Sequence, residues 1–251
     1  MKNLIPANWF EPWFNSPYYH ILYDQRSEEE AAAFIDRLVA QLAPPADARL
    51  LDIACGKGRH SRQLAAKGFD VTGIDLASES IAYALQFENE HLHFYQQDMR
   101  NAFHSNAYDY AFNFFTSIGY FHTDQEDART FSNFALALKP GGHLVIDFLN
   151  THQAVRQLKA QQQLTKQGIV FDVRKEYDGK YFYKQIQVSD KDQHFTFYEK
   201  LRAFTLADFE LLFNKNGLHI EQCFGDYALN KYDAASSSRL IIVAKKANKE
   251  H

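Results

Sequence analysis

The stretch from Leu50 to Ser61, LLDIACGKGRHS, constrains the fold of this chain more than any other segment. A short apolar run leads into a turn that contains Gly56 and Gly58, and a helical pattern follows. A strand, a glycine turn and a helix in that order are typical of α/β folds that hold a phosphate or a nucleotide-like cofactor at the turn. The segment therefore predicts a parallel sheet with a ligand site at its carboxyl edge.

Alternating strand and helix patterns continue on both sides of this motif. Such alternation predicts a parallel sheet that helices cover on both faces. Before the motif, a helix is expected at 27–42, with Ser27 as its N-cap and two prolines after its end. The expected strands are 48–55, 69–76, 92–98, 108–115 and 143–150, and the expected helices are 58–68, 78–87 with Ser78 as its cap, and 125–138, followed by a KPGG turn at 139–142.

After Asn150 the pattern changes. Three extended stretches between residues 169 and 204, separated by DG and SDKD turn signals, predict an antiparallel meander. Their aromatic and charged residues alternate, so each strand should have one apolar and one wet face. A helix at 205–217 and strands at 218–224 and 239–246 follow. We expect the meander to cover the substrate cleft, and a homodimer through it is a further expectation.

The expected organisation therefore has three parts. An N-terminal helical cap or lid spans 1–46, and the α/β core comprises 47–150 and 205–251. The antiparallel β insertion spans 151–204.

Composition narrows the function. The chain has 251 residues and a formal net charge of −4, so a nucleic-acid partner is not expected. Its two cysteines, Cys55 and Cys223, have no metal-ligand spacing, and no metal site is expected. The absence of a long apolar run argues against a membrane partner and favours a cytoplasmic location.

Three interpretations compete for the glycine turn. A P-loop would need Lys followed by Ser or Thr after its second glycine, where this chain has Arg59 and His60. A dinucleotide fingerprint would need three glycines, and GKGRHS supplies two, with Ser61 in the last place. The third interpretation is a site for S-adenosylmethionine (SAM).

Three aspartates favour SAM. Asp52, Asp75 and Asp98 stand at the ends of the first three expected strands of the sheet, and such ends meet at one edge of a parallel sheet. A carboxylate at Asp52 is unwelcome beside a pyrophosphate but suits a cationic, amine-bearing ligand. Asp75 is placed to accept both hydroxyls of a ribose, and Asp98 to accept from an adenine amine.

With these motifs in this order, the chain resembles the class I SAM-dependent methyltransferases. The resemblance rests on LLDIACGKGRHS, VTGIDLA, QQDMR and LKPGGHLVIDF, and it covers residues 48–150 closely. It implies a Rossmann-like, doubly wound and mostly parallel sheet of seven strands whose last strand runs antiparallel. Ala54 departs from the family, in which a glycine is most common at this place.

The resemblance also implies roles for single residues. The methionine part would lie against Asp52 and the glycine turn, with Arg59 near its carboxylate, and Asp75 would take the ribose hydroxyls. Asp98 and Met99 would border the adenine. The implied cofactor-binding residues are Asp52, Ala54, Gly56, Gly58, Arg59, Asp75, Leu76, Asp98, Met99 and Phe114.

Candidate substrate residues come from two aromatic segments. Tyr18, Tyr19 and Tyr23 precede the first long helix and are interpreted as part of a lid, with core aromatics as the alternative. Tyr120 and His122 follow the small polar residues of FNFFTSIGYF, a loop expected to line the site, although His122 equally fits a surface histidine.

The function expected from these observations is SAM-dependent methyl transfer to the nitrogen or oxygen of a small-molecule acceptor. A nicotinamide-dependent oxidoreductase and a SAM-binding protein without catalysis are the alternatives. Methyl transfer depends on proximity and alignment more than on a reactive side chain, so no catalytic residue is assigned.

Overall fold

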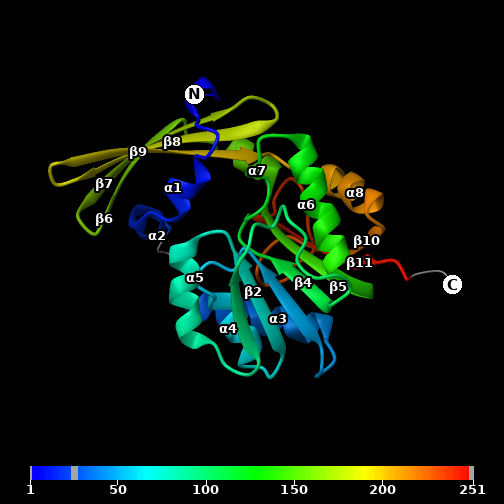
Figure 1. The fold of residues 1–251 in the computed structure, drawn as a ribbon. Helices are drawn as coiled ribbons and strands as arrows, with labels where there is room; N and C mark the ends of the chain where they lie inside the picture. The colour runs from blue at the N-terminus through cyan, green and yellow to red at the C-terminus, as the bar shows by residue number, and fades with distance from the viewer. Residues whose placement is uncertain (1, 24–27, 249–251) are drawn as a thin grey trace.

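The computed structural model describes residues 2–23 and 28–248. The central sheet is formed by β1 (Arg49–Ile53), β2 (Asp70–Asp75), β3 (Leu92–Gln96), β4 (Tyr108–Asn113), β5 (Leu138–Leu149), β10 (Leu218–Phe224) and β11 (Arg239–Lys246). Its seven strands lie in the order β10-β11-β5-β4-β1-β2-β3, and β11 runs antiparallel to both of its neighbours (Figure 1). The predicted Rossmann-like sheet with an antiparallel last strand is confirmed.

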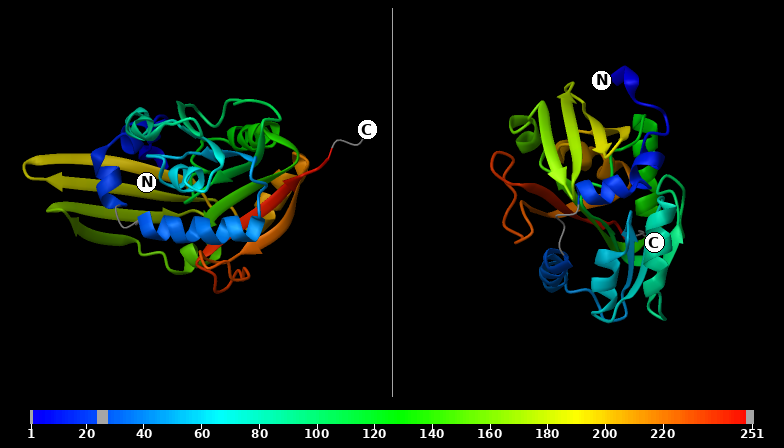
Figure 2. Two further views of the ribbon diagram at one scale, coloured as in Figure 1. Left: turned by 90° about the horizontal axis from the view of Figure 1, so that it is seen from below. Right: turned by 90° about the vertical axis from the view of Figure 1, so that its left-hand side faces the viewer.

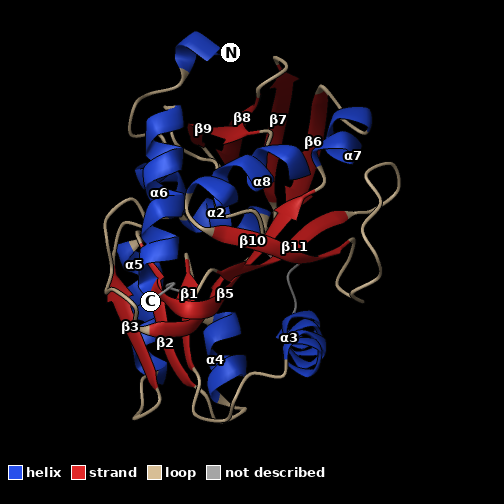
Figure 3. Ribbon diagram, turned by 90° about the vertical axis from the view of Figure 1, so that its right-hand side faces the viewer, coloured by secondary structure: helices blue, strands red, loops and turns tan. Residues whose placement is uncertain are grey.

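Helices cover both faces of this sheet (Figures 2 and 3). One face packs against α3 (Glu28–Leu42), α4 (Arg59–Ala65) and α5 (Ser78–Ala84), and the other against α6 (Asp124–Ala137) and α8 (Leu206–Lys215). Side chains of β1 alternate between these two layers, because successive residues of a strand point to opposite faces. Leu50 thus packs in the layer with Phe34, whereas Leu51 packs in the layer with Phe131.

A second, antiparallel sheet lies beside the core and comprises β6 (Gln161–Lys166), β7 (Ile169–Tyr177), β8 (Tyr181–Asp190) and β9 (Gln193–Arg202). The short helix α7 (Thr151–Arg156) leads into it. The sequence predicted three strands here, which is wrong by one. The missed strand, β6, reads QQQLTK, so it lacks the β-branched and aromatic residues that mark a strand, and it lies at the edge of the sheet.

The N-terminal segment packs on the second sheet. It contains a short 3₁₀ turn (η1, Lys2–Leu4), α1 (Phe10–Phe14) and α2 (Pro17–Leu22). Trp9 and Trp13 are buried in one cluster with Phe171 and Ile186 of the sheet. Ser16 caps α2, since its hydroxyl accepts a hydrogen bond from the backbone N–H of Tyr18 at 3.1 Å.

Two local predictions are corrected. Ser78 does not cap α5; the N-cap position is Ala77, whose N–H donates to Asp75 Oδ1 at 2.8 Å. The KPGG segment is not a free turn but part of β5, where Gly141 has a φ of +77°. The predicted Ser27 cap lies outside the described residues.

Asp127 of α6 is an acid buried without compensation. It is 2% exposed, and neither of its carboxylate oxygens has a hydrogen-bond partner among the described residues. Burial raises its pKa to about 7. The folded protein therefore holds a proton that the unfolded chain releases near pH 4.

The raised pKa of Asp127 predicts how the free energy of unfolding depends on pH. Between pH 4 and about 7 the folded state binds more protons than the unfolded state, so stability should fall as pH rises through this window. Asp127→Asn removes the ionisable group, so the variant should melt at a higher temperature than the wild type at pH 8.5, with little difference at pH 4.5. Calorimetric melting at both pH values measures this. Asp192→Asn, in the exposed β8–β9 turn, is the control, and equal behaviour of the two variants would contradict the prediction.

Candidate functional site

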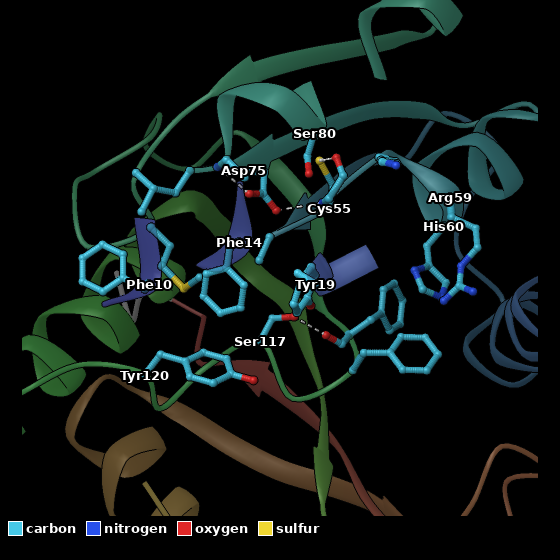
Figure 4. Close-up of a pocket in the computed structure, with 18 of the residues that line it drawn as sticks. Phe10, Phe14, Tyr19, Cys55, Arg59, His60, Asp75, Ser80, Ser117 and Tyr120 are labelled. Carbon is cyan, nitrogen blue, oxygen red and sulfur yellow. Dashed lines mark hydrogen bonds between the residues drawn. The ribbon is translucent and has the colours of Figure 1, made fainter. Parts of the chain in front are cut away.

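The first cavity has a volume of about 400 Å³ and lies at the carboxyl ends of β1, β2 and β4. The glycine turn and Asp75 form one side of it, and aromatic residues of the N-terminal segment form another (Figure 4). Phe10, Phe14 and Tyr19 therefore face the turn across the cavity. A site enclosed by aromatic rings and a polar turn suits a cofactor with both apolar and polar parts.

The backbone of the glycine turn is left-handed at three residues. Ala54, Gly56 and Gly58 have φ values of +60°, +56° and +76°. Gly58 also approaches the sheet closely, because a Cβ there would lie 2.5 Å from the ring of Phe94. Ala54 adopts a conformation that favours glycine, which explains why the family prefers glycine at its position.

Asp75 at the end of β2 orders this turn. Its Oδ2 accepts from the N–H of Gly56 at 2.8 Å, and its Oδ1 accepts from the N–H of Ala77 at 2.8 Å. Burial raises the pKa of the carboxyl, and these backbone hydrogen bonds act in the opposite direction. Since each carboxylate oxygen has a second lone pair, both can accept another hydrogen bond from a ligand in the cavity.

Asp52 does not reach the cavity lining. It is 1% exposed, and its Oδ2 accepts from the hydroxyl of Ser61 at 2.6 Å. Burial raises its pKa to about 7, although the bond from Ser61 lowers it. Asp52 therefore lies behind the turn and fixes the start of α4, which contains Ser61.

Asp98 lines the cavity but is already paired. The guanidinium of Arg100 donates to both carboxylate oxygens of Asp98. Its Nε donates to Oδ1 and, at 3.0 Å, to Oδ2, and its Nη2 donates to Oδ2 at 2.7 Å. Burial alone would raise the pKa of Asp98, and Arg100 offsets this, so the pKa lies below its usual value. Arg100 also pairs with Glu126 at 2.8 Å, so Asp98 lies beside Met99 in the lining as part of a three-membered charge cluster.

The other predicted site residues divide into two groups. Gly58 lies outside the lining, as do two predicted substrate residues: Tyr18 donates to Asp190 at 3.2 Å, and His122 Nε2 lies 2.7 Å from the carbonyl oxygen of Ala7. The predicted residues that line the first cavity are Ala54, Gly56, Arg59, Asp75, Leu76, Asp98, Met99, Phe114, Tyr19, Tyr23 and Tyr120.

A second cavity, of about 480 Å³, lies between the two sheets. It shares Tyr19, Tyr23, Phe115 and Tyr120 with the first cavity. We call these four residues the shared wall. The second sheet supplies much of the remaining lining, so the first cavity opens toward a space that the β insertion covers.

The chain is strained at the shared wall. Phe115 and Thr116 are both in the left-handed region, with φ values of +58° and +61°, which costs energy for residues with a side chain. Asp147 holds this conformation, since its Oδ2 accepts from the N–H of Phe115 at 2.9 Å and its backbone oxygen accepts from Thr116 at 2.8 Å. Arg239 neutralises the buried Asp147 at 2.8 Å.

Glu199 of β9 joins the N-terminal segment to the second sheet. It accepts from Trp13 Nε1 at 2.8 Å and from the Tyr23 hydroxyl at 2.6 Å, and it pairs with Lys184 at 2.6 Å. Burial would raise the pKa of this carboxyl, but the charge of Lys184 and the three donors lower it overall. Glu199 therefore remains ionised and holds Tyr23 of the shared wall in place.

Sequence reasoning missed Asp147, Arg239, Lys184 and Glu199. For the last two a signal exists in the strand pattern, because both stand at positions that belong to the apolar face of the second sheet. A charge on the apolar face of a strand marks either a buried pair or a site. Asp147 and Arg239 pair only through the fold, and their sequence contains no comparable signal.

A comparison with known families concerns the part of the chain that forms much of the first cavity. Residues 50–142 match the family model described as a methyltransferase domain. This part of the chain is similar to methyltransferase domains. The matched segment runs from β1 into β5 and contains the glycine turn, Asp75 and Asp98.

Curated relatives of known name match about half of this chain. A Bacillus subtilis protein named as a methyltransferase is 38% identical over 109 residues, which cover 41% of this chain and 43% of the relative. A dTDP-3-amino-3,4,6-trideoxy-alpha-D-glucopyranose N,N-dimethyltransferase of Streptomyces venezuelae is 31% identical over 132 residues, which cover 51% and 54% of the two chains. The chain thus spans about half the length of the curated relatives it matches.

Solved structures extend the likeness to the whole fold. A SAM-dependent methyltransferase from Clostridium acetobutylicum superposes with a TM-score of 0.77 at 18% identity, over 92% of this chain and 96% of the other. The fold is therefore that of the SAM-dependent methyltransferases. The similarity in fold includes the second sheet as well as residues 50–142, because the alignment covers nearly the whole chain.

Two further properties of the described residues concern partners. In residues 2–23 and 28–248, no three His, Cys, Asp or Glu side chains gather in a way that suits a metal ion. No helix in that same part of the chain combines the length and apolar character needed to cross a membrane. Both cysteines are free thiols, with Cys55 buried at the glycine turn.

We expect the buried ion pair between Glu199 and Lys184 to contribute measurably to the free energy of unfolding. Glu199→Gln leaves the Lys184 ammonium without its counter-charge, so the free energy of unfolding should fall by about 3–5 kcal/mol. Urea unfolding measures this, and Glu221→Gln, which breaks surface pairs with His143 and Lys245, should cost at most about 1 kcal/mol. A double change, Glu199→Leu with Lys184→Met, should restore the part of the loss that comes from the unpaired ammonium, but not the part that comes from the donors of Trp13 and Tyr23. Equal effects of Glu199→Gln and Glu221→Gln would show that the buried pair of Glu199 contributes no more to stability than the surface pairs of Glu221.

Proposed function

We propose that the protein is a SAM-dependent methyltransferase that binds SAM in the first cavity and a small-molecule acceptor in the second. The observation that carries this proposal is the shared wall. Two cavities that meet at four aromatic residues can place a methyl donor and its acceptor in contact while excluding water. The first cavity contains the glycine turn, Asp75 and Asp98, and all of these lie in the segment that matches the methyltransferase family model.

The residues around the first cavity fit SAM. Asp75 has two oxygens with lone pairs to spare, which suit the two ribose hydroxyls. No atom lies within 4 Å of a Cβ built on Gly56, so the turn leaves room for the methionine part close to its backbone. Asp98 and Met99 would border the adenine, and Arg59 would lie near the cofactor carboxylate. The proposed SAM-binding residues are Ala54, Gly56, Arg59, Asp75, Leu76, Asp98, Met99 and Phe114, with Asp52 and Gly58 supporting the turn from behind.

When bound, SAM supplies a methyl group on a positively charged sulfur, which is already activated for displacement. The chain itself contributes alignment and a dry space. Tyr19 and Tyr120 supply aromatic rings at the boundary, which suit a nearby cation. Phe115, held by Asp147, closes the boundary from the side of β4. No side chain is assigned as a catalytic base.

The acceptor is proposed to be a small molecule. We propose the insertion at 151–204 as the roof of the second cavity. Of the lid expected at 1–46, residues 2–23 would cover the site, because α3 packs on the central sheet. Tyr19, Tyr23 and Tyr120 would contact the acceptor. The named sugar-amine N,N-dimethyltransferase among the relatives supports a nitrogen acceptor of this size class. A homodimer through the insertion is part of this proposal and is tested by sedimentation.

Two other functions are weaker. A nicotinamide oxidoreductase would share the sheet and the glycine turn, but its fingerprint lacks the third glycine. A SAM-binding protein without catalysis would need only the first cavity, and it leaves the second cavity and the strained boundary at Phe115 without a role.

A melting experiment with added ligands tests the cofactor. SAM and its demethylated product should each raise the melting temperature, whereas NAD should not. A ligand at about a hundred times its dissociation constant stabilises by about 2.7 kcal/mol, which is a visible shift. The same protein should transfer labelled methyl groups from SAM to a component of a metabolite mixture. A higher melting temperature with NAD and an unchanged one with SAM would contradict the proposal.

Asp75 gives the sharpest single test of cofactor binding. Asp75→Ala should weaken SAM binding by about a hundredfold or more, because two charge-assisted hydrogen bonds of about 1.5–3 kcal/mol each are lost. Asp75→Glu should weaken it less. Asp70→Ala, at the exposed opposite end of the same strand, should leave SAM binding unchanged. Calorimetry measures all three, and unchanged affinity in Asp75→Ala would show that this acid does not bind the ribose.

A further inference from the structure

A row of three charged residues crosses the otherwise apolar face of the second sheet. The strand register places Lys175 of β7 opposite Lys184 of β8, and Lys184 opposite Glu199 of β9. On either side the same face carries apolar rows, such as Val173, Ile186 and Phe197. All three charged residues line the second cavity.

The row is not neutral. Glu199 is matched by Lys184, which also donates to the hydroxyl of Tyr23 at 2.9 Å. Lys175 remains, and among the described residues its ammonium has no hydrogen-bond or ion-pair partner, although the side chain is half-buried. A cation that is partly removed from water without a counter-charge is costly, so its presence calls for a function.

The other charges around the second cavity do not compensate Lys175. Arg239 is positive and already paired with Asp147. Lys159, exposed at the lining, adds a further positive charge. Among the described lining residues the acid is Glu199, and it is already paired with Lys184. The cavity therefore has a surplus of positive charge around Lys175.

The titration of Lys175 agrees with this surplus. Burial lowers the pKa of its ammonium, and the neighbouring charges of Lys184 and Lys159 lower it further, while Glu199 acts in the opposite direction. An anion bound beside Lys175 would reverse this shift, because an opposite charge at contact distance favours the charged form. The positive groups are thus arranged for an anionic partner from outside the chain.

We infer that the acceptor in the second cavity bears an acid group, a carboxylate or a phosphate, and that Lys175 binds this group with Lys159 at the lining. This inference rests on the proposed function and names the chemical class of its substrate. The amides of Gln157 and Gln162 lie in the same lining and can donate further hydrogen bonds.

The position of Lys175 also orients the acceptor. Tyr23 belongs to the shared wall, Lys184 contacts Tyr23, and Lys175 stands one strand beyond Lys184. Neighbouring strands lie about 4.8 Å apart, so the acid group would be held a few ångströms behind the wall. The other end of the acceptor would then face the first cavity, where the methyl group would be transferred.

Anion titration of the purified protein tests this inference without a known acceptor. Inorganic pyrophosphate and malonate serve as probes for the two acid groups, with the demethylated product of SAM saturating the first cavity. Calorimetry should show that one or both probes bind the wild type, and that Lys175→Met weakens this binding by about tenfold or more. Lys175→Arg should retain most of it. Preference for one probe identifies the acid group as phosphate or carboxylate.

Controls separate this outcome from general charge effects. Lys191→Met removes an exposed lysine of the β8–β9 turn in the same sheet and should leave probe binding unchanged. Each variant should bind the demethylated product of SAM as the wild type does. Failure of both probes to bind the wild type, or equal binding in Lys175→Met, would overturn the inference. If SAM itself does not bind, the proposed function fails, whereas the probes titrated alone still decide the role of Lys175.

Discussion

The buried carboxylate of Asp147 is the constraint on which the arrangement of the two cavities depends. It holds Phe115 and Thr116 in a left-handed conformation that neither residue favours, and this bend turns the chain after β4 across the carboxyl edge of the sheet. Arg239 at the start of the antiparallel β11 supplies the charge that makes such burial tolerable. The reversed last strand therefore contributes to the site as well as to the sheet.

The aromatic residues of the shared wall depend on two separate parts of the chain. Tyr19 and Tyr23 come from the N-terminal segment, but Glu199 and Lys184 of the insertion hold Tyr23 in place. Trp13 donates to the same Glu199. The N-terminal segment thus packs on the insertion and lines the first cavity at the same time, so cofactor and acceptor spaces are expected to form together.

The sequence predicted the core sheet well, because its signals are local. A strand, a glycine turn and a helix follow one another around Gly56, and the acids at strand ends can be assigned to one edge before any contact is known. The second cavity could not be predicted from local sequence signals, because contacts between distant segments form it. Lys184 and Glu199 become neighbours only through the register of two strands, and Arg239 meets Asp147 across 92 residues of chain. Strand β6 was missed because polar glutamines gave it no periodic signal.

Both tryptophans of the chain, Trp9 and Trp13, lie in the N-terminal segment. The ring of Trp9 is 5.7 Å from that of Tyr120, and the indole of Trp13 touches Glu199. Indole fluorescence of this protein therefore originates beside the shared wall, with no contribution from the core sheet. The chain has in effect a built-in optical reporter, whose emission follows the polarity of the boundary between the two cavities without any added label.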